Sequence, residues 1–178
     1  MKNVVVISST PRINGNSEIL AQEFARGAKD AGHSVEVITL RNYNLKYCIG
    51  CYACHRTGKC IHDDGMNELS EKLLKADVLV FATPVYFYSM SGQLKVFIDR
   101  LVPHYAKIKA DTYLIATQWD SDKEIMENTF NAIRGCTMDC FENCSEKGLI
   151  YGVGLTDVGE ARKNQEYMTQ AYNMGKNV

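Results

Sequence analysis

The feature that most constrains the fold of this chain is an alternation of short apolar runs with amphipathic segments. Residues 4–7 and 78–81 are continuously apolar, as expected of parallel strands that are covered on both faces. The expected strands are 3–8, 34–40, 76–83, 112–117 and 149–153. The expected helices are 17–31, 66–75, 93–102, 123–134 with a continuation toward Cys144, and 160–173. Strands alternating with helices in this way predict a doubly wound α/β sheet with right-handed crossovers.

Length and charge narrow the class of protein further. The 178 residues contain no repeat, linker or low-complexity stretch, so we expect one domain over residues 1–178. The net charge of −1, with no basic stripe, argues against a nucleic-acid or membrane partner. No apolar run approaches the roughly 20 residues of a membrane helix. The first strand begins almost at once and leaves no room for a signal segment, so the expected location is cytoplasmic.

A polar loop follows the first strand and ends at a predicted helix N-terminus. Such a terminus offers unpaired N–H groups and a partial positive charge, both of which favour a phosphate group. The loop lacks the glycine–lysine pattern of triphosphate sites and the glycine pattern of dinucleotide sites, and it suits a single terminal phosphate. The alternative is an ordinary helix cap with a polar turn. The candidate phosphate-binding residues are Ser9, Thr10, Arg12, Asn14, Asn16 and Ser17.

The doubly wound topology predicts that the loops after the first, third and fourth strands converge at one edge of the sheet. The second of these loops, 83–92, contains Tyr86, Phe87 and Tyr88 in succession. All three cannot face the core, so the cluster favours a ligand with an aromatic ring and a phosphate tail. The alternative is that the rings fill the core or a dimer interface.

Two groups of cysteines need separate explanations. Cys48, Cys51, Cys54 and Cys60 form a C-x2-C-x2-C-x5-C motif, compact enough to converge on one inorganic centre. A 4Fe–4S cluster, a zinc ion and free thiols all remain open, although the final gap differs from that of bacterial ferredoxins. Cys136, Cys140 and Cys144 recur at four-residue spacing, which we interpret as a buried stripe on one helix face. Asp63, Asp64 and His104 are interpreted as structural or solvated groups.

Taken together, these motifs give the chain a family resemblance over nearly its whole length. The segments SSTPRINGNS, TPVYFYSMSGQLKVFIDR and CIGCYACHRTGKC, the last followed by an acidic turn, resemble those of flavodoxin-fold NAD(P)H-dependent FMN reductases, and within them the iron–sulfur flavoproteins. The resemblance implies a flavodoxin-like three-layer α/β/α sandwich, strand order 2-1-3-4-5, FMN at the carboxyl edge, and a homodimer or homotetramer. It also implies that the flavin ring is contacted by Pro84, Val85, Tyr86, Phe87, Thr117 and Gln118.

The expected function is that of an FMN-dependent oxidoreductase that passes electrons from NAD(P)H or reduced ferredoxin to a quinone, a flavin or a similar small acceptor. If the four cysteines hold an iron–sulfur cluster, single-electron exchange with a ferredoxin is favoured. If they hold no cluster, NADH or NADPH is favoured as the electron donor. This chemistry requires no protein acid or base, so no catalytic residue is assigned. The alternative is a flavodoxin-type electron carrier without substrate turnover, although such carriers are usually more acidic than this chain.

Overall fold

The computed structural model describes residues 1–178 and contains one five-stranded parallel sheet in the order β2-β1-β3-β4-β5. The strands are β1 (Asn3–Ser8), β2 (Ser34–Thr39), β3 (Val78–Pro84), β4 (Lys109–Thr117) and β5 (Asn143–Gly152). Every residue of the central strand β3 is buried, in keeping with the apolar run at 78–81. The predicted strand order is confirmed.

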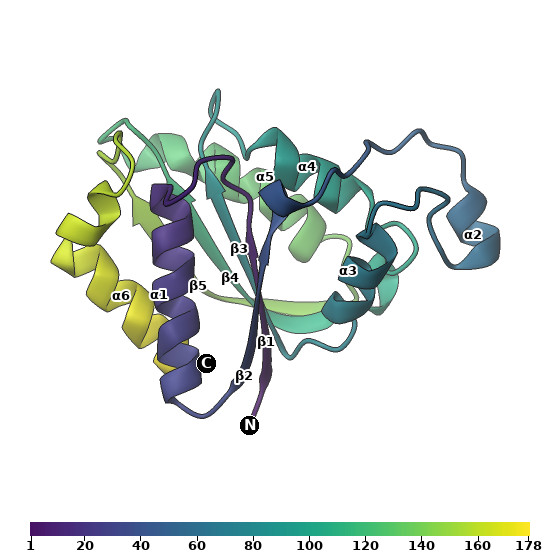
Figure 1. Ribbon diagram of the computed structural model, residues 1–178, viewed down its shortest axis with the longest axis horizontal. Helices are drawn as coiled ribbons and strands as arrows, with labels where there is room; N and C mark the ends of the chain where they lie inside the picture. The colour runs from purple at the N-terminus through teal and green to yellow at the C-terminus, as the bar shows by residue number, and fades with distance from the viewer.

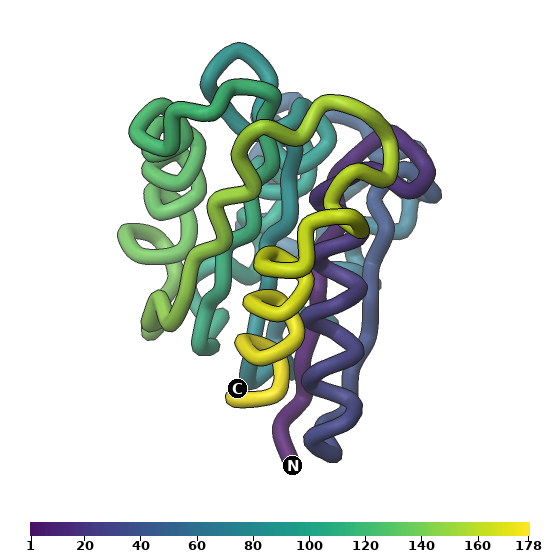
Figure 2. The backbone as a smooth tube through the Cα atoms, turned by 90° about the vertical axis from the view of Figure 1, so that its left-hand side faces the viewer, coloured from purple at the N-terminus to yellow at the C-terminus, as the bar shows by residue number.

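Helices cover both faces of this sheet (Figures 1 and 2). They are α1 (Asn16–Asp30), α2 (Ala53–Thr57), α3 (Met66–Leu73), α4 (Gly92–Asp99), α5 (Glu127–Thr137) and α6 (Gln165–Lys176). Short 3-10 helices are η1 (Leu40–Asn42), η2 (Tyr105–Lys107), η3 (Glu124–Met126) and η4 (Glu160–Lys163). Buried residues of α1 and α6 belong to one core cluster and those of α3, α4 and α5 to the other, which gives the predicted three-layer sandwich. None of the helices is long and apolar enough to cross a membrane.

Helices α1 and α6 pack against each other through glycines. A Cβ atom at Gly175 would lie 1.9 Å from the backbone oxygen of Phe24, and one at Gly27 would lie 2.0 Å from that of Tyr172. No side chain can be placed at such distances, so the close approach of the two helices depends on both glycines. Helix α6 thereby holds the C-terminal end of the chain beside α1 (Figure 2).

The predicted helical continuation toward Cys144 is wrong. Helix α5 ends at Thr137, and Cys144 lies on β5, which begins six residues before the predicted strand. Exposed and partly buried residues alternate over 143–148, because this end of the strand is at the sheet edge and one face meets solvent. The predicted buried stripe also fails at Cys140, which is exposed, whereas Cys136 is buried. The strand was missed because its first residues are mostly polar, so no apolar alternation with a period of two is visible there. The four-residue spacing of the cysteines, which suggested a helix, is coincidental.

Candidate functional site

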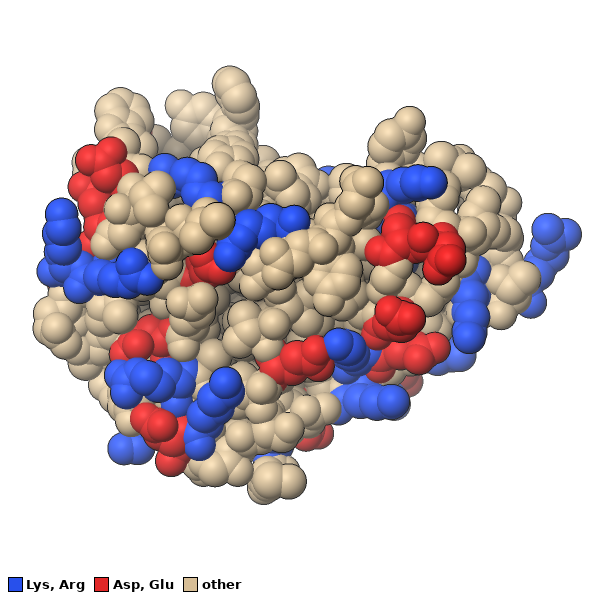
Figure 3. Space-filling view, viewed as in Figure 1, with Lys and Arg blue, Asp and Glu red and all other residues tan.

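The loops after β1, β3 and β4 lie together at the carboxyl edge of the sheet, as predicted (Figure 1). Hydrogen bonds join them directly. The Ser9 N–H donates to the oxygen of Ala82 at 3.0 Å, and the Val85 N–H donates to the oxygen of Thr117 at 2.8 Å. The Ser91 hydroxyl donates to the Ser9 hydroxyl at 3.0 Å and fixes the start of α4 beside the first loop. In Figure 3 the uppermost projections along this edge are uncharged, with both signs of charge mixed below them.

The first loop presents unpaired donors at the tip of α1. The backbone N–H groups of Asn16, Ser17 and Glu18 have no partner within the chain, as is usual for the first turn of a helix. Ser17 is 1% exposed, and its buried hydroxyl also has no partner. A Cβ atom at Gly15 would lie 2.6 Å from Thr10 Oγ1, so the loop closes too tightly for a larger residue there. These donors fit a phosphate group.

Two other predicted phosphate-loop hydroxyls already have partners within the chain. Ser9 Oγ donates to the oxygen of Ala82 at 2.9 Å, and Thr10 Oγ1 accepts from the Arg12 N–H at 3.3 Å. A hydroxyl that accepts one hydrogen bond can still donate another, so Thr10 remains able to contact an anion. Ser9 instead ties the loop to β3.

The remaining predicted side chains of this loop contact the segment 156–162, between β5 and α6. Arg12 donates to the oxygen of Thr156 at 3.0 Å, and the Asn14 side-chain oxygen accepts from Arg162 at 2.9 Å. The Asn16 amide donates to the oxygen of Asp157 at 2.9 Å and accepts from the Ala161 N–H at 3.0 Å. These side chains therefore hold the shape of the loop. Sequence reasoning missed the contribution of 156–162, because nothing in its composition indicates contact with residues more than 140 positions away.

The aromatic loop forms a tight turn closed by a bridge between Tyr86 and Ser89. Its two central residues are left-handed, with φ of 49° at Phe87 and 60° at Tyr88. This conformation suits Gly, Asn or Asp, so an aromatic pair is held there against its backbone preference. Phe87 is fully exposed, and its N–H and that of Tyr88 have no partner within the chain. The expectation that at least one ring leaves the core is confirmed.

A hollow of about 180 Å³ lies between this turn and the loop after β4. Its lining includes Val85, Phe87, Tyr88, Gln118 and Trp119. Gln118 is 6% exposed, its amide nitrogen donates to the backbone oxygens of 120 and 122, and its side-chain oxygen has no partner. Sequence reasoning missed Trp119, although the single tryptophan of the chain follows directly after the predicted Gln118.

The two residues of the predicted ring site that come from strand ends are buried. Pro84 is the last residue of β3, and Thr117 is the last of β4. Their backbones pair in the sheet, and Thr117 accepts the hydrogen bond from Val85. Neither residue lines the hollow itself, but each is followed directly by one that does, Val85 and Gln118.

The four cysteines of the compact motif line a second hollow, also about 180 Å³, together with Ile49, Ile61 and His62. Burial raises the pKa of the Cys54 thiol, and the neighbouring Cys60, Cys51 and Cys48 raise it further. No three of the side chains that commonly bind metals are close enough to hold one in this structure. The donor set of four soft thiols lining one hollow nevertheless fits an iron–sulfur cluster or zinc in its chemistry.

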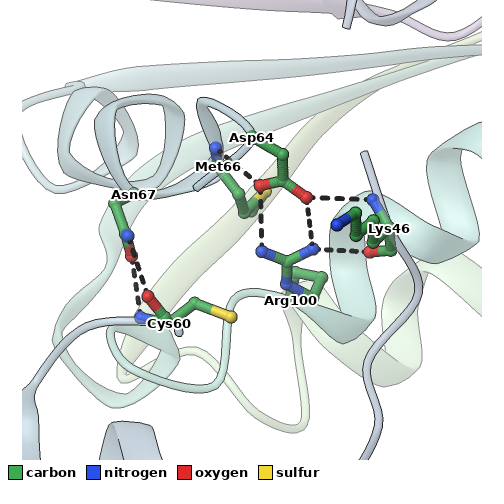
Figure 4. A network of polar contacts seen from close by, with 6 residues as sticks. All are labelled: Lys46, Cys60, Asp64, Met66, Asn67 and Arg100. Atoms are coloured by element: carbon green, nitrogen blue, oxygen red, sulfur yellow. Dashed lines mark hydrogen bonds and ion pairs between the residues drawn. The ribbon is translucent and has the colours of Figure 1, made fainter. Parts of the chain in front are cut away.

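A buried ion pair closes the base of this cysteine loop (Figure 4). Arg100, at the end of α4, makes two contacts of 3.0 and 3.1 Å to the Asp64 carboxylate. The two side chains are 1% and 6% exposed. Asp64 accepts from the Lys46 N–H at 2.9 Å, and Arg100 donates to the Lys46 oxygen, so both ends of the loop are joined. Asn67 holds the backbone of Cys60 through bonds of 2.8 and 3.0 Å.

Asp64 is thus structural, as predicted from the sequence. Burial alone would raise the pKa of its carboxyl group, but the hydrogen bonds from Arg100 and Lys46 outweigh burial and hold that pKa below its usual range. Asp63 beside it is exposed. Burial also lowers the pKa of His104.

The sheet order, with helices on both faces of the sheet, defines a flavodoxin-like α/β protein. A solved NAD(P)H:quinone oxidoreductase from Methanothermobacter marburgensis has the same fold, with a TM-score of 0.78 and 17% identity over 99% of this chain and 95% of that chain. Residues 2–118 match the family model described as NADPH-dependent FMN reductase. The chain belongs to the NADPH-dependent FMN reductase family.

Other relatives are more similar in sequence, among them iron–sulfur flavoproteins of two archaea. An iron–sulfur flavoprotein of Methanocaldococcus jannaschii is 38% identical over 100 residues, which are 56% of this chain and 52% of that protein. One from Archaeoglobus fulgidus is 33% identical over 104 residues, which are 58% of this chain and 47% of that protein. The matches to these curated relatives therefore span about half of their length.

Proposed function

We propose that the protein transfers electrons from NAD(P)H or reduced ferredoxin to a quinone, a flavin or a similar small acceptor, with FMN bound at the carboxyl edge of the sheet. The observation that carries the proposal is the buried Ser17 hydroxyl, unpaired beside the free N–H groups of α1. It lies at the same edge as an aromatic-lined hollow, which matches a ligand with a phosphate tail and a flat ring.

In this proposal the chain binds and orients the cofactor, and FMN supplies the redox chemistry. Ser17 and the first turn of α1 donate to the phosphate, with Thr10 beside them. Val85, Phe87 and Gln118 would contact the ring, and Trp119, which lines the same hollow, would lie beside it. The N–H groups of Phe87 and Tyr88 are free to stabilise negative charge on the ring, whereas those of Val85 and Tyr86 are already bonded within the chain.

We further propose that Cys48, Cys51, Cys54 and Cys60 hold a 4Fe–4S cluster. Supporting this are the four thiols around one hollow and the relatives described as iron–sulfur flavoproteins. Such a centre exchanges single electrons and would suit a ferredoxin partner. The protein would act in the cytoplasm as a single-domain subunit of a homodimer or homotetramer.

Anaerobic purification followed by an absorbance spectrum tests both cofactors. Flavin bands support FMN, and a red-shifted shoulder with matching iron and sulfide supports the cluster. Cys51→Ala should remove the shoulder and keep the flavin bands, with Cys140→Ala, an exposed thiol outside the motif, as the matched control. A colourless protein that takes up no added FMN contradicts the proposal.

Turnover is tested by anaerobic oxidation of NADH, NADPH and reduced ferredoxin with a quinone or free FMN as acceptor. Ser17→Ala should weaken FMN binding, whereas Ser145→Ala, on an exposed position of β5, should not. Bound FMN without turnover with any of these donors would favour the electron-carrier alternative.

A further inference from the structure

A buried acid lies directly after the proposed phosphate-binding residues 9–17, here called the phosphate loop, and the proposed binding of FMN does not explain it. Glu18 lies in the first turn of α1 and is 3% exposed. Its Oε2 atom accepts a hydrogen bond from the Asn14 N–H at 2.9 Å. Asn14 has a φ of 57°, a left-handed conformation that asparagine adopts more readily than most residues, and the loop bends at this position. The carboxylate therefore holds the bend of the loop from inside.

The other oxygen of this carboxylate binds an arginine from the neighbouring loop. Arg41, in η1 directly after β2, places Nη2 2.8 Å from Glu18 Oε1. Its Nη1 atom is buried and has no partner within the chain. The pair thus connects the end of β2 to the phosphate loop and leaves one guanidinium donor unused.

A carboxylate next to a phosphate site is unfavourable unless its charge is balanced. The positive end of the α1 dipole offsets a part of the charge, because acidic residues are favoured in the first turn of a helix. The guanidinium supplies a full opposite charge at hydrogen-bond distance. Without it, a buried negative charge would face the incoming phosphate where water screens little.

We propose that Glu18 and Arg41 are a positioning pair that makes the loop able to bind the phosphate of FMN. Glu18 fixes the left-handed Asn14, and Arg41 cancels the charge of Glu18 so that the phosphate is not repelled. This inference rests on the proposed FMN site and concerns the phosphate alone. The pair should therefore distinguish FMN from riboflavin, which has the same ring and no phosphate.

The test measures the Kd of FMN and of riboflavin for the flavin-free full chain by quenching of flavin fluorescence. Arg41→Met leaves the carboxylate unbalanced, so the Kd of FMN should rise at least about tenfold while that of riboflavin stays within about twofold. Glu18→Gln keeps an acceptor for the Asn14 N–H and removes the negative charge, so FMN should bind as tightly as to the wild type or more tightly. The double variant E18Q/R41M should recover most of the FMN affinity.

The matched control is Glu23–Arg26, a second acid–arginine pair on the same helix, with the arginine exposed. Arg26→Met should change neither Kd. Equal losses of FMN and riboflavin affinity in R41M, or no recovery in the double variant, would overturn the positioning role while wild-type FMN binding stands. A wild type that binds riboflavin and FMN equally weakly would overturn the FMN site itself and this inference with it.

Discussion

Replacing Asp64 with asparagine should disorder the cysteine loop and leave the loops after β1, β3 and β4 in place. The substitution removes the charge that faces Arg100 and keeps nearly the same volume. Arg100, which is 1% exposed, then retains a buried positive charge without a counter-ion. The contacts at 3.0 and 3.1 Å lose their ionic character, and the link between Lys46 and the end of the loop weakens.

Breaking a buried ion pair by removing one partner costs about 3–5 kcal/mol. In a chain of this size each kcal/mol lowers Tm by about 2–4 °C, so Asp64→Asn should lower Tm by about 6–20 °C. The matched control is Asp63→Asn at the exposed neighbouring position, which should change Tm by less than about 2 °C. Urea unfolding gives the free energies, and amide hydrogen exchange locates the effect. Residues 46–64 should exchange faster in Asp64→Asn, whereas β1 and β3 should not.

The pH dependence of folding stability provides a second test of this ion pair. Because the pKa of Asp64 is lowered in the folded state, the pair stabilises the protein fully above the ordinary Asp pKa of about 3.9 and is lost as the pH falls through the lower folded-state value. Asp64→Asn should therefore flatten the stability curve in this acidic range. The assignment of this pair as the anchor of the loop would be refuted if Asp64→Asn lowered the unfolding free energy by less than about 1 kcal/mol. It would also be refuted if the unfolding free energies of the wild type and Asp64→Asn depended on acidic pH in the same way.

Three further predictions concern other parts of the fold. Gly175→Ala should separate α6 from α1 and lower the unfolding free energy by about 3 kcal/mol or more in urea titrations, since its Cβ would meet a backbone oxygen at 1.9 Å. The double substitution Phe87→Asn and Tyr88→Gly should stabilise the flavin-free protein by about 1–2 kcal/mol and so raise its Tm, because both positions have a left-handed backbone. Burial and the hydrogen bond to Glu127 raise the pKa of Tyr151 to about 12, so its stabilising effect should decline from about pH 10 through 12. Ultraviolet titration of tyrosinate in the wild type and Tyr151→Phe measures this pKa.

The sheet was predictable because its strands carry strong and independent signals. Buried strands such as β3 are apolar over most of their length, so few polar positions confuse the pattern, and their order followed from the family resemblance. The edge strand β5 was different. In its first half, exposed polar residues alternate with the partly buried Cys144, Glu146 and Gly148, and neither apolar character nor a turn signal marks its beginning. Helix α2 was missed because five residues within the cysteine loop are too few for helical periodicity.

The candidate site was predictable where adjacent residues define it and unpredictable where distant segments meet. The convergence of three loops follows from parallel topology. The topology does not determine whether a polar side chain faces a ligand or another loop. Asn16 is an example, because its amide binds the segment 156–162. Glu18 and Arg41 show the same limitation, because each sequence neighbourhood is ordinary for a helix start and a strand end.

Helix α4 connects the two sites proposed for electron transfer. At its N-terminus, Ser91 caps the helix and binds Ser9 beside the phosphate loop. At its C-terminus, Arg100 closes the cysteine loop. Eight helical residues span about 12 Å, and the buried Leu94 and Phe97 hold the helix against the sheet. The spacing of the two loops is thus set by one packed element. For this reason the loss of the Asp64–Arg100 pair should release the cysteine loop at one end of α4, while the Ser91 contacts keep the flavin end in place.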